Sequence, residues 1–190
     1  MFDRLPFAAG AIRLRRLKND DLAAFHAYRS DADVARFQGW APMSMRQAAG
    51  FLAAEARHRQ LVPGNWHQVA IASAGDDALI GDMGVWVSVD RLQAELGLSI
   101  NPRHQGKGYG TQAVRALVHL LFSTTPVSEV IAHADIRNLP CLALLARSGM
   151  RYRSASTAEY KGEMCTEQLF GISRSEALAS SGAEHATGTV

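Results

Sequence analysis

The strongest constraint on the fold of this chain is a glycine-rich loop that joins a strand-like run to a helix-like run. The run at 93–100 (QAELGLSI) is largely apolar, the loop covers 101–110 (NPRHQGKGYG), and residues 108–122 carry apolar side chains at helical spacing. Glycine lets the backbone approach a ligand closely because it has no Cβ. The free N–H groups at the start of a helix bind anions. The loop therefore predicts a site for a phosphate-bearing cofactor.

The spacing within this loop excludes two common phosphate-binding patterns. A dinucleotide fingerprint requires G-x-G-x-x-G, but Thr111 stands where the third glycine would be. A P-loop requires G-x-x-x-x-G-K-[ST], and the chain has no such spacing. The pattern present is R-x-x-G-x-G, and the alternative is a glycine-rich turn that binds no ligand. We expect these residues of the loop and first helical turn to contact the cofactor: Arg103, Gln105, Gly106, Lys107, Gly108, Gly110 and Thr111.

The composition is that of one reduced, water-soluble domain. The chain has 190 residues, of which 47% are hydrophobic, enough for one well-formed core. Its formal net charge of +2 is far from the strongly basic footprint of a dedicated nucleic-acid binder. Cys141 and Cys165 form no CxxC or Cys/His pattern, so we expect no metal site and a reducing compartment. No stretch approaches the ~20 apolar residues that span a bilayer. We expect a cytoplasmic protein with no membrane or nucleic-acid partner.

Hydrophobic periodicity predicts one domain over residues 1–172. Turn signals separate three central strand-like runs, which predicts an antiparallel meander. Ser44 with Gln47 forms a capping-box pattern, and Asn19 is positioned to cap an earlier helix. Residues 173–190 are small, polar and aperiodic, so we expect a disordered tail. The expected strands lie at 11–17, 66–73, 79–89, 93–100, 128–134, 150–156 and 164–172, and the expected helices begin near 19, 44, 108 and 138.

The loop pattern and the order of these elements resemble the GNAT superfamily of N-acetyltransferases, whose pyrophosphate loop reads [Q/R]-x-x-G-x-[G/A]. Within that superfamily the chain is similar to the RimJ/RimL-type branch of ribosomal-protein N-terminal acetyltransferases. The similarity rests on FQGWAP at 37–42, AELGLSINP at 94–102, the loop itself, and the stretch from Asn138 to Met150. The resemblance implies an α/β (α+β) fold, with a mixed, mostly antiparallel sheet of about seven strands, splayed at its centre and flanked by about four helices. It also implies acetyl-CoA as the acyl donor.

The resemblance places a general base at Glu95, in the strand before the loop. The reaction needs a base because only a neutral amine attacks a thioester. A lysine amine with a pKa of ~10.4 costs roughly 4 kcal/mol to deprotonate near neutral pH, whereas an α-amine near ~8.0 costs under about 1 kcal/mol. A carboxylate acting directly or through a water would collect that proton. The alternative is a solvated strand residue.

The helix that begins near Asn138 departs from its relatives at the position of the general acid. Many GNAT enzymes carry a tyrosine where this chain has Leu145, and RimL-like enzymes carry a serine at the position of Cys141. Cys141 would protonate the departing CoA thiolate, since two thiols have similar pKa values near ~8.5. The alternative is a small apolar residue packed in the first helical turn. Asn138 would hold the pantetheine arm, cap the helix, or do both.

The splayed strands implied by the resemblance leave backbone N–H groups between Leu98 and Ile100 unpaired, and we expect these to bind the thioester oxygen as charge develops on it. By resemblance, the acceptor is the α-amine of a protein or peptide N-terminus. A small amine is the alternative, and the missing tyrosine leaves a non-catalytic acyl-CoA-binding module as a third reading. An open sheet edge would allow a homodimer. Three tryptophans are candidates for the acceptor pocket or for packing: Trp40, Trp66 and Trp86.

Overall fold

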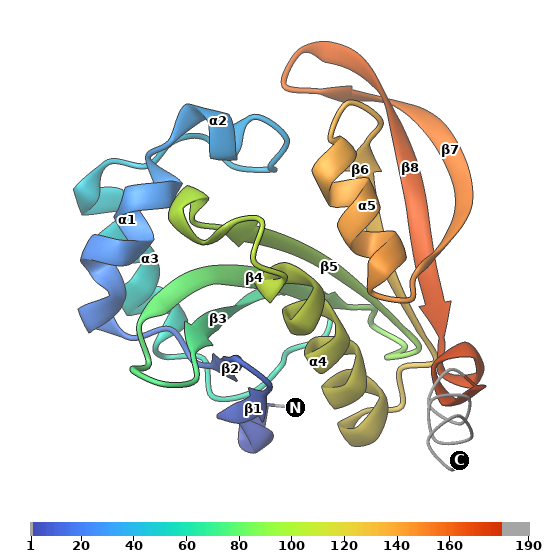
Figure 1. Cartoon of the computed structure of the whole chain (residues 1–190), viewed down its shortest axis with the longest axis horizontal. Helices are drawn as coiled ribbons and strands as arrows, with labels where there is room; N and C mark the ends of the chain where they lie inside the picture. The colour runs from blue at the N-terminus through green and yellow to red at the C-terminus, as the bar shows by residue number, and fades with distance from the viewer. Residues whose placement is uncertain (1, 180–190) are drawn as a thin grey trace.

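A mixed eight-stranded sheet forms the centre of the protein (Figure 1). The computed structural model describes residues 2–179. The strand order is β1-β2-β3-β4-β5-β6-β8-β7, and every neighbouring pair is antiparallel except the parallel pair β5–β6. The strands are β1 (Phe7–Ala9), β2 (Ile12–Arg15), β3 (Trp66–Ser73), β4 (Leu79–Val87), β5 (Gln93–Ile100), β6 (Glu129–Asp135), β7 (Arg151–Tyr160) and β8 (Glu163–Ser173). This confirms the expected α+β fold, with eight strands in place of about seven.

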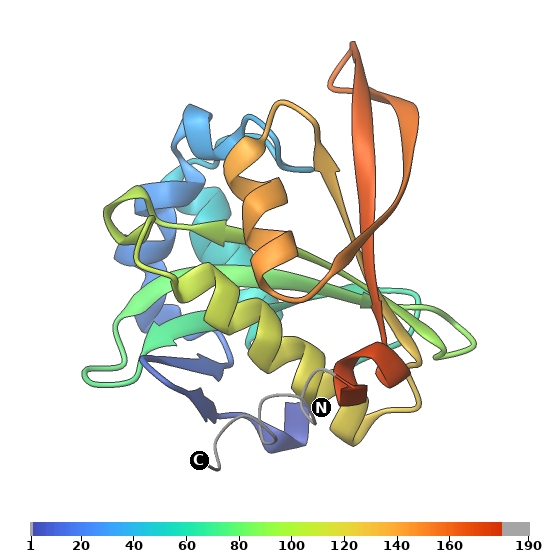
Figure 2. The ribbon, with the colours of Figure 1, turned by 45° about the vertical axis from the view of Figure 1, so that its right-hand side comes forward.

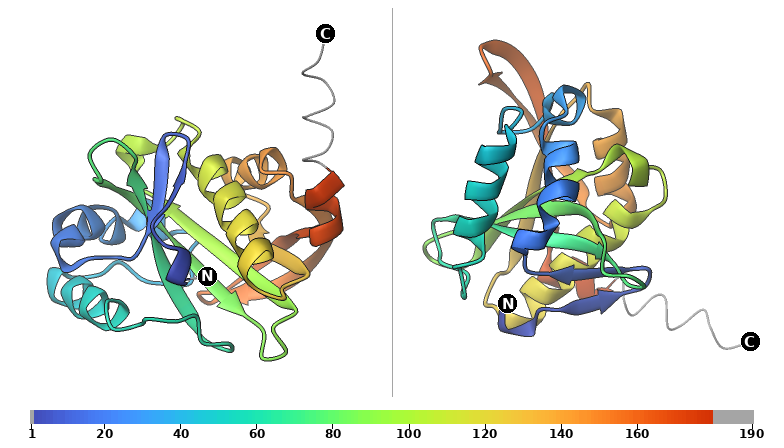
Figure 3. Two further views of the ribbon diagram at one scale, coloured as in Figure 1. Left: turned by 90° about the horizontal axis from the view of Figure 1, so that it is seen from below. Right: turned by 90° about the vertical axis from the view of Figure 1, so that its left-hand side faces the viewer.

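The helices lie on both faces of this sheet (Figure 3). Helices α4 and α5 pack on one face, where Leu117, Leu121 and Leu145 belong to the larger apolar core. Helices α1 and α3 cover the other face, where Phe25 and Leu52 belong to a second core. The α-helices are α1 (Leu22–Arg29), α2 (Ala32–Ala35), α3 (Met45–Glu55), α4 (Tyr109–Thr124) and α5 (Leu139–Arg147), and short 3-10 helices cover Phe2–Arg4, Asn19–Asp21 and Pro102–His104. Across residues 2–179, the helices are too short or too polar to cross a lipid bilayer.

The divergence of β5 and β6 splits the sheet at its centre. Only Gln93, Ala94 and Glu95 of β5 pair with β6, although β5 continues to Ile100 and β6 to Asp135. Figure 1 shows the two strands separating toward the side where α2 and the tip of the β7–β8 hairpin lie. The sheet therefore opens into a gap at the end of β5 from which the glycine-rich loop leaves, as the resemblance implies.

Local signals in the sequence account for several helix ends. Ser44 and Gln47 form the expected capping box at the start of α3. Asn138 caps α5 by accepting a hydrogen bond from the Cys141 backbone N–H. After α5, Gly149 adopts a left-handed conformation with φ of 91°, which ends the helix as its position predicts.

Two expectations at the N-terminal side differ from the structure. Strand β1 was not expected; it has three residues and is paired to β2 through a turn at Gly10, whose φ is 61°. Asn19 does not cap an α-helix, because it opens a 3-10 turn that precedes α1. There the Asp21 carboxylate accepts from the Lys18 backbone N–H and also binds Arg15. The contacts of Asp21 with Lys18 and Arg15, rather than the helix propensity of Asn19, determine where this helix starts.

The C-terminal segment also differs from its expectation over part of its length. Ser173 ends β8, and residues 174–179 are helical. Glu176 accepts hydrogen bonds from Arg153 and from the Ser173 backbone N–H, and these lower the pKa of its carboxyl to about 2. These contacts, which sequence periodicity does not reveal, attach the segment to the sheet. The rest of the expected tail, residues 180–190, lies outside the described residues.

Candidate active site

The gap between β5 and β6 exposes backbone groups of β5. Gln38 Nε2 donates a hydrogen bond to the Leu98 carbonyl oxygen over 3.1 Å, and Gln105 Nε2 donates to the Ile100 carbonyl oxygen over 3.0 Å. In an antiparallel strand, the N–H and C=O of one residue point to the same side. The N–H groups of Leu98 and Ile100 therefore face the gap as well. That they bind a thioester oxygen stays a prediction.

The glycine-rich loop presents its backbone to solvent at the end of β5. Gly106 and Gly108 have φ of 73° and 80°, a left-handed conformation that favours glycine. A Cβ added at either position would meet no atom of residues 2–179 within 4 Å, so the surface of the loop is open. Gly110 differs, because it is buried and a Cβ there would lie 2.5 Å from Leu144 Cδ1. Gly110 is therefore needed for close packing of α4 on α5, and the other two glycines for the open loop.

The start of α4 carries unsatisfied backbone donors. Gly108 is the residue that precedes the helix, and no side chain within residues 2–179 caps it. The first N–H groups of an α-helix have no partner inside the helix, so they are available to an anion. The site fits a phosphate group without any change of the chain.

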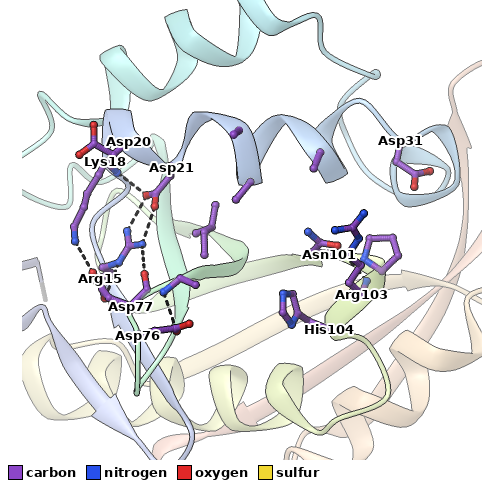
Figure 4. Close-up of a pocket in the computed structure, with 16 residues that line it drawn as sticks. Arg15, Lys18, Asp20, Asp21, Asp31, Asp76, Asp77, Asn101, Arg103 and His104 are labelled. Carbon is purple, nitrogen blue, oxygen red and sulfur yellow. Dashed lines mark hydrogen bonds and ion pairs between the residues drawn. The ribbon is translucent and has the colours of Figure 1, made fainter.

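Arg103 and His104 line a groove on the other side of the loop (Figure 4). The groove has a volume of about 800 Å³ and lies between the loop, α1 and the β3–β4 turn. Its far wall is an ion-pair network in which Arg15 binds both Asp21 and Asp77. A hydrogen bond from Lys18 is the main cause that lowers the pKa of Asp77. Arg103 therefore extends toward the α1 side, and its expected contact with the cofactor stays a prediction.

The face of the sheet opposite α4 carries aromatic and carboxylate side chains in one cross-strand row. Trp66 of β3 lies opposite Trp86 of β4, and Trp86 lies opposite Glu95 of β5. In the next row on this face, Gly84 lies opposite Gly97. A Cβ on Gly97 would meet no atom of the described chain within 4 Å, so the space above it is open. We call this face, from Trp66 across to β6, the acceptor face, after the role that we propose for it below.

Glu95 lies at the last paired position before the gap, and it has a partner on β6. Its Oε1 is 3.2 Å from Nδ1 of His133. Side chains two residues apart on a strand share a face, so His133 lies beside Ile131, the residue that pairs with Glu95. The Glu95 side chain is 30% exposed and the His133 side chain is 37% exposed. A carboxylate and an imidazole thus meet where the strands part, and no pattern in the sequence predicted this pair.

A bridge of two chain segments closes one end of the acceptor face. The segment after α2 crosses over the gap, where Gln38 reaches β5. Lys161, at the tip of the β7–β8 hairpin, donates hydrogen bonds to the carbonyl oxygens of Ala35 (2.7 Å) and Trp40 (3.0 Å). The Trp40 ring lies 4.4 Å from the guanidinium of Arg29, which is buried with Asp82. Sequence analysis assigned no role to Lys161 or to Gln38, although Gln38 lies in the FQGWAP stretch, because the partners of both are distant in sequence.

Asn138 precedes α5 as its N-cap, and Cys141 lies in the first turn of that helix. Asn138 Oδ1 accepts from the Cys141 N–H over 3.3 Å, so its capping role is observed and its amide nitrogen is left for another partner. Burial raises the pKa of the Cys141 thiol to about 11. Leu145, at the position of the missing tyrosine, is fully buried in the core. The side chain at that position thus packs in the core and does not reach solvent.

A family model described as an acetyltransferase (GNAT) domain matches residues 11–151, most of the chain. The chain belongs to the GNAT acetyltransferase family. This GNAT protein is 23% identical over 138 residues to the Bacillus subtilis protein named uncharacterized N-acetyltransferase YnaD, covering 73% of this chain and 78% of that relative.

Two solved structures with bound coenzyme A have a similar fold. One is the spermidine N-acetyltransferase of Vibrio cholerae with CoA and spermine, at a TM-score of 0.75 and 18% identity, covering 88% of this chain and 98% of that chain. The other is RimL, a ribosomal L7/L12 alpha-N-protein acetyltransferase with CoA, at a TM-score of 0.76 and 15% identity, covering 88% and 97%. This GNAT acetyltransferase is an N-acetyltransferase, and its fold neighbours act on both polyamine and protein amines.

GNAT enzymes use acetyl-CoA as the acyl donor, and the residues of this family member fit that molecule. The open loop with the uncapped start of α4 would hold the pyrophosphate, and the strand edge left free where β5 and β6 part would pair with the pantetheine arm. When bound, acetyl-CoA supplies an activated acetyl thioester.

Proposed function

We propose that this chain transfers the acetyl group of acetyl-CoA to the α-amine of a protein or peptide N-terminus, by direct attack of the amine on the thioester. The observation that carries the proposal is the gap between β5 and β6. At one end it has an open phosphate-binding loop, and on the acceptor face it has the Glu95–His133 pair. In this proposal Leu98 and Ile100 N–H groups hold the thioester oxygen, the pair removes the amine proton, and Cys141 hydrogen-bonds the departing sulfur.

The charges around the acceptor face favour a monovalent amine over a polycation. Asp82 is bound by Arg29, and Asp135 at the end of β6 is bound by Arg137. Asp82 and Asp135 are therefore neutralised and offer little attraction to a second ammonium group, which leaves Glu167, opposite Asp135 on β8, as the carboxylate beside them. A hydrogen bond from Arg137 is the main cause that lowers the pKa of Asp135, so it stays ionised and paired at neutral pH.

Exposed apolar side chains near the β4–β5 turn, at one end of the acceptor face, favour a polypeptide. Trp66 is 49% exposed, and Val62 and Val89 nearby are 45% and 81% exposed. Exposed apolar side chains beside a site suit the side chains that follow the first residue of a peptide. An α-amine also needs less help to become neutral than a lysine or polyamine nitrogen, because its pKa is ~8 and theirs are ~10.

The proposal is tested by binding and turnover with matched variants. Calorimetry measures the affinity for acetyl-CoA, and release of free thiol measures turnover with an alanine-initiated peptide, the same peptide with a blocked N-terminus and an internal lysine, and spermidine. We expect acetyl-CoA binding and turnover of the free α-amine at least tenfold faster than of the others. Tight binding without turnover of any amine would indicate an acyl-CoA-binding module, and fastest turnover of spermidine a small-amine enzyme.

Two glycine variants test the loop. Gly108→Glu puts a carboxylate where the phosphates bind, and we expect acetyl-CoA affinity to fall by about 100-fold or more, since like charges repel. Gly162→Glu is the matched control, because Gly162 has almost the same φ (81° against 80°) and equally open surroundings within the described residues. Both variants place a glutamate at nearly the same positive φ. If the two bind acetyl-CoA equally well, the loop does not hold the phosphates.

A further inference from the structure

We propose that His133 accepts the amine proton, and that Glu95 acts by orienting the imidazole of His133 and by stabilising the imidazolium that forms. This inference rests on the proposed function and reverses the role expected for Glu95. It starts from one contact, the 3.2 Å approach of His133 Nδ1 to Glu95 Oε1.

The contact sets the tautomer of the imidazole. An ionised carboxylate only accepts hydrogen bonds, so Nδ1 must carry the proton that is shared with Glu95. Nε2 is then the ring atom with the free lone pair. Among residues 2–179, Nε2 makes no hydrogen bond. A neutral imidazole with a free Nε2 is a competent general base.

The choice between the two groups also follows from general acid–base chemistry. A general base works best when its pKa lies near the operating pH. Imidazoles as a class titrate near ~6.5 and glutamic acids near ~4.3, so an imidazole is the stronger base for a protonated amine intermediate. A carboxylate at Nδ1 stabilises the imidazolium that forms, as an opposite charge does at close range.

The place of His133 in the fold suits the task. It lies on β6, across the gap from the β5 backbone donors at Leu98 and Ile100, so an amine between the strands has an oxygen-binding group on one side and a base on the other. The charged groups that face His133 are Glu95 from β5, the Arg137-bound Asp135 two residues along β6, and Glu167 of β8, which pairs with Asp135. Leu169 of β8 lies directly opposite His133.

The step balances as follows. The neutral amine nitrogen attacks the thioester carbon, a C–N bond forms, and the carbonyl electron pair moves to the oxygen. His133 Nε2 takes one N–H proton, the electron pair on oxygen re-forms the C=O bond, and the C–S bond breaks with its electron pair leaving on sulfur, which gives the amide and the thiolate. The thiolate gains a proton from solvent while the Cys141 S–H hydrogen-bonds to it. Imidazolium then returns its proton to solvent, which the 37% exposure of the side chain allows.

The test compares His133→Asn with Glu95→Gln. Asparagine keeps an N–H donor near the position of Nδ1 but has no basic nitrogen, so we expect kcat with the α-amine peptide to fall about 100-fold or more, within the range for loss of a general base. Glu95→Gln keeps an acceptor for Nδ1 and loses only the charge, so we expect a fall of about tenfold. Both variants keep the acetyl-CoA affinity of the unmodified chain. His26→Asn on α1 controls for loss of a histidine and keeps full activity.

A spectroscopic readout separates this inference from the proposed function. Nitrogen–proton NMR of the imidazoles reports the tautomer of each of the seven histidines, and the His133 signals are those lost in His133→Asn. We expect the Nδ1–H tautomer in the unmodified protein. An Nε2–H tautomer, or a larger loss of kcat in Glu95→Gln than in His133→Asn, overturns the inference. No turnover by the unmodified protein with any amine overturns the proposed function, and the inference with it.

Discussion

At the scale of single residues, the surroundings of Cys141 determine how readily its thiol gives up a proton. Burial in the first turn of α5 raises the pKa of its thiol to about 11. Full proton transfer from such a thiol to a thiolate of ordinary pKa costs roughly 3 kcal/mol, at 1.36 kcal/mol per pKa unit. Donation of a hydrogen bond carries no such cost. The structure therefore favours Cys141 as a hydrogen-bond donor to the departing sulfur over Cys141 as its acid.

Substitution at Cys141 separates this role from packing. We expect Cys141→Ser to keep kcat within about threefold, because a hydroxyl still donates a hydrogen bond, and Cys141→Ala to lose roughly tenfold, about 1.4 kcal/mol. Steady-state kcat and melting temperature are measured for both. If Cys141 only packs, we expect Cys141→Ala to be more stable than Cys141→Ser. A buried serine hydroxyl without a partner costs about 1–3 kcal/mol, and alanine has no such group. Equal rates for alanine and the unmodified protein would mean that solvent alone serves the thiolate.

At the scale of elements, β5 joins two environments with opposite demands on side-chain size. It packs closely on β4, where a Cβ on Gly81 would lie 2.2 Å from the Ser99 carbonyl oxygen. Further along the same pair, Gly97 opens onto the acceptor face, where an added Cβ meets nothing in the described chain within 4 Å. Gly81 thus lets the backbones of β4 and β5 approach closely, and Gly97 leaves space for a ligand.

This contrast predicts different outcomes for two alanine substitutions. Gly81→Ala must move the backbone of β5, so we expect a loss of roughly 2–4 kcal/mol in the free energy of unfolding, the scale of overpacking in a core. Gly97→Ala should leave stability unchanged or slightly higher, because glycine in a strand is itself unfavourable. Its methyl group instead narrows the acceptor face, and we expect kcat/KM for the amine to fall several-fold. Urea unfolding and kinetics on both variants check this, and a stable Gly81→Ala protein with full activity would contradict the close approach.

The sequence could predict those parts of the fold and site that depend only on residues close together in the chain. The capping box at Ser44, the stop at Gly149 and the open loop at Gly106 and Gly108 each depend on a few consecutive positions. Strand β1 is too short for periodicity to detect. The Glu95–His133 pair joins residues 38 apart in the chain, and it exists only because β5 and β6 are parallel neighbours in one register. Register between distant strands is a property of the folded sheet, so the pair could not be predicted locally.

At the scale of the whole molecule, Lys161 joins the two halves of the chain: the β7–β8 hairpin projects past α5 on the side where α2 lies (Figure 2). The segment after α2 comes from the N-terminal half, and the β7–β8 hairpin from the C-terminal end. Lys161 joins them through contacts that span 126 and 121 residues of sequence. Lys161 also has a positive φ of 52°, which with Gly162 makes the tight turn that holds its ammonium group in position. The hydrogen bonds from Lys161 to α2 and the segment after it thus form the boundary of the acceptor face on that side.

This bridge predicts a selective effect of Lys161→Met. The side chain keeps its length and loses its donors, so the segment around Trp40 is no longer fixed. A hydrogen bond from a charged donor is worth about 1.5–3 kcal/mol, and we expect KM for the amine to rise about tenfold or more, with acetyl-CoA affinity unchanged because the glycine-rich loop is on other elements. Lys161→Arg, which retains donors, is expected to recover most of the loss. Two results for Lys161→Met would contradict a selective role of the bridge in the acceptor site. One is an acetyl-CoA affinity that falls by the same factor as the amine KM rises, and the other is no change in either quantity.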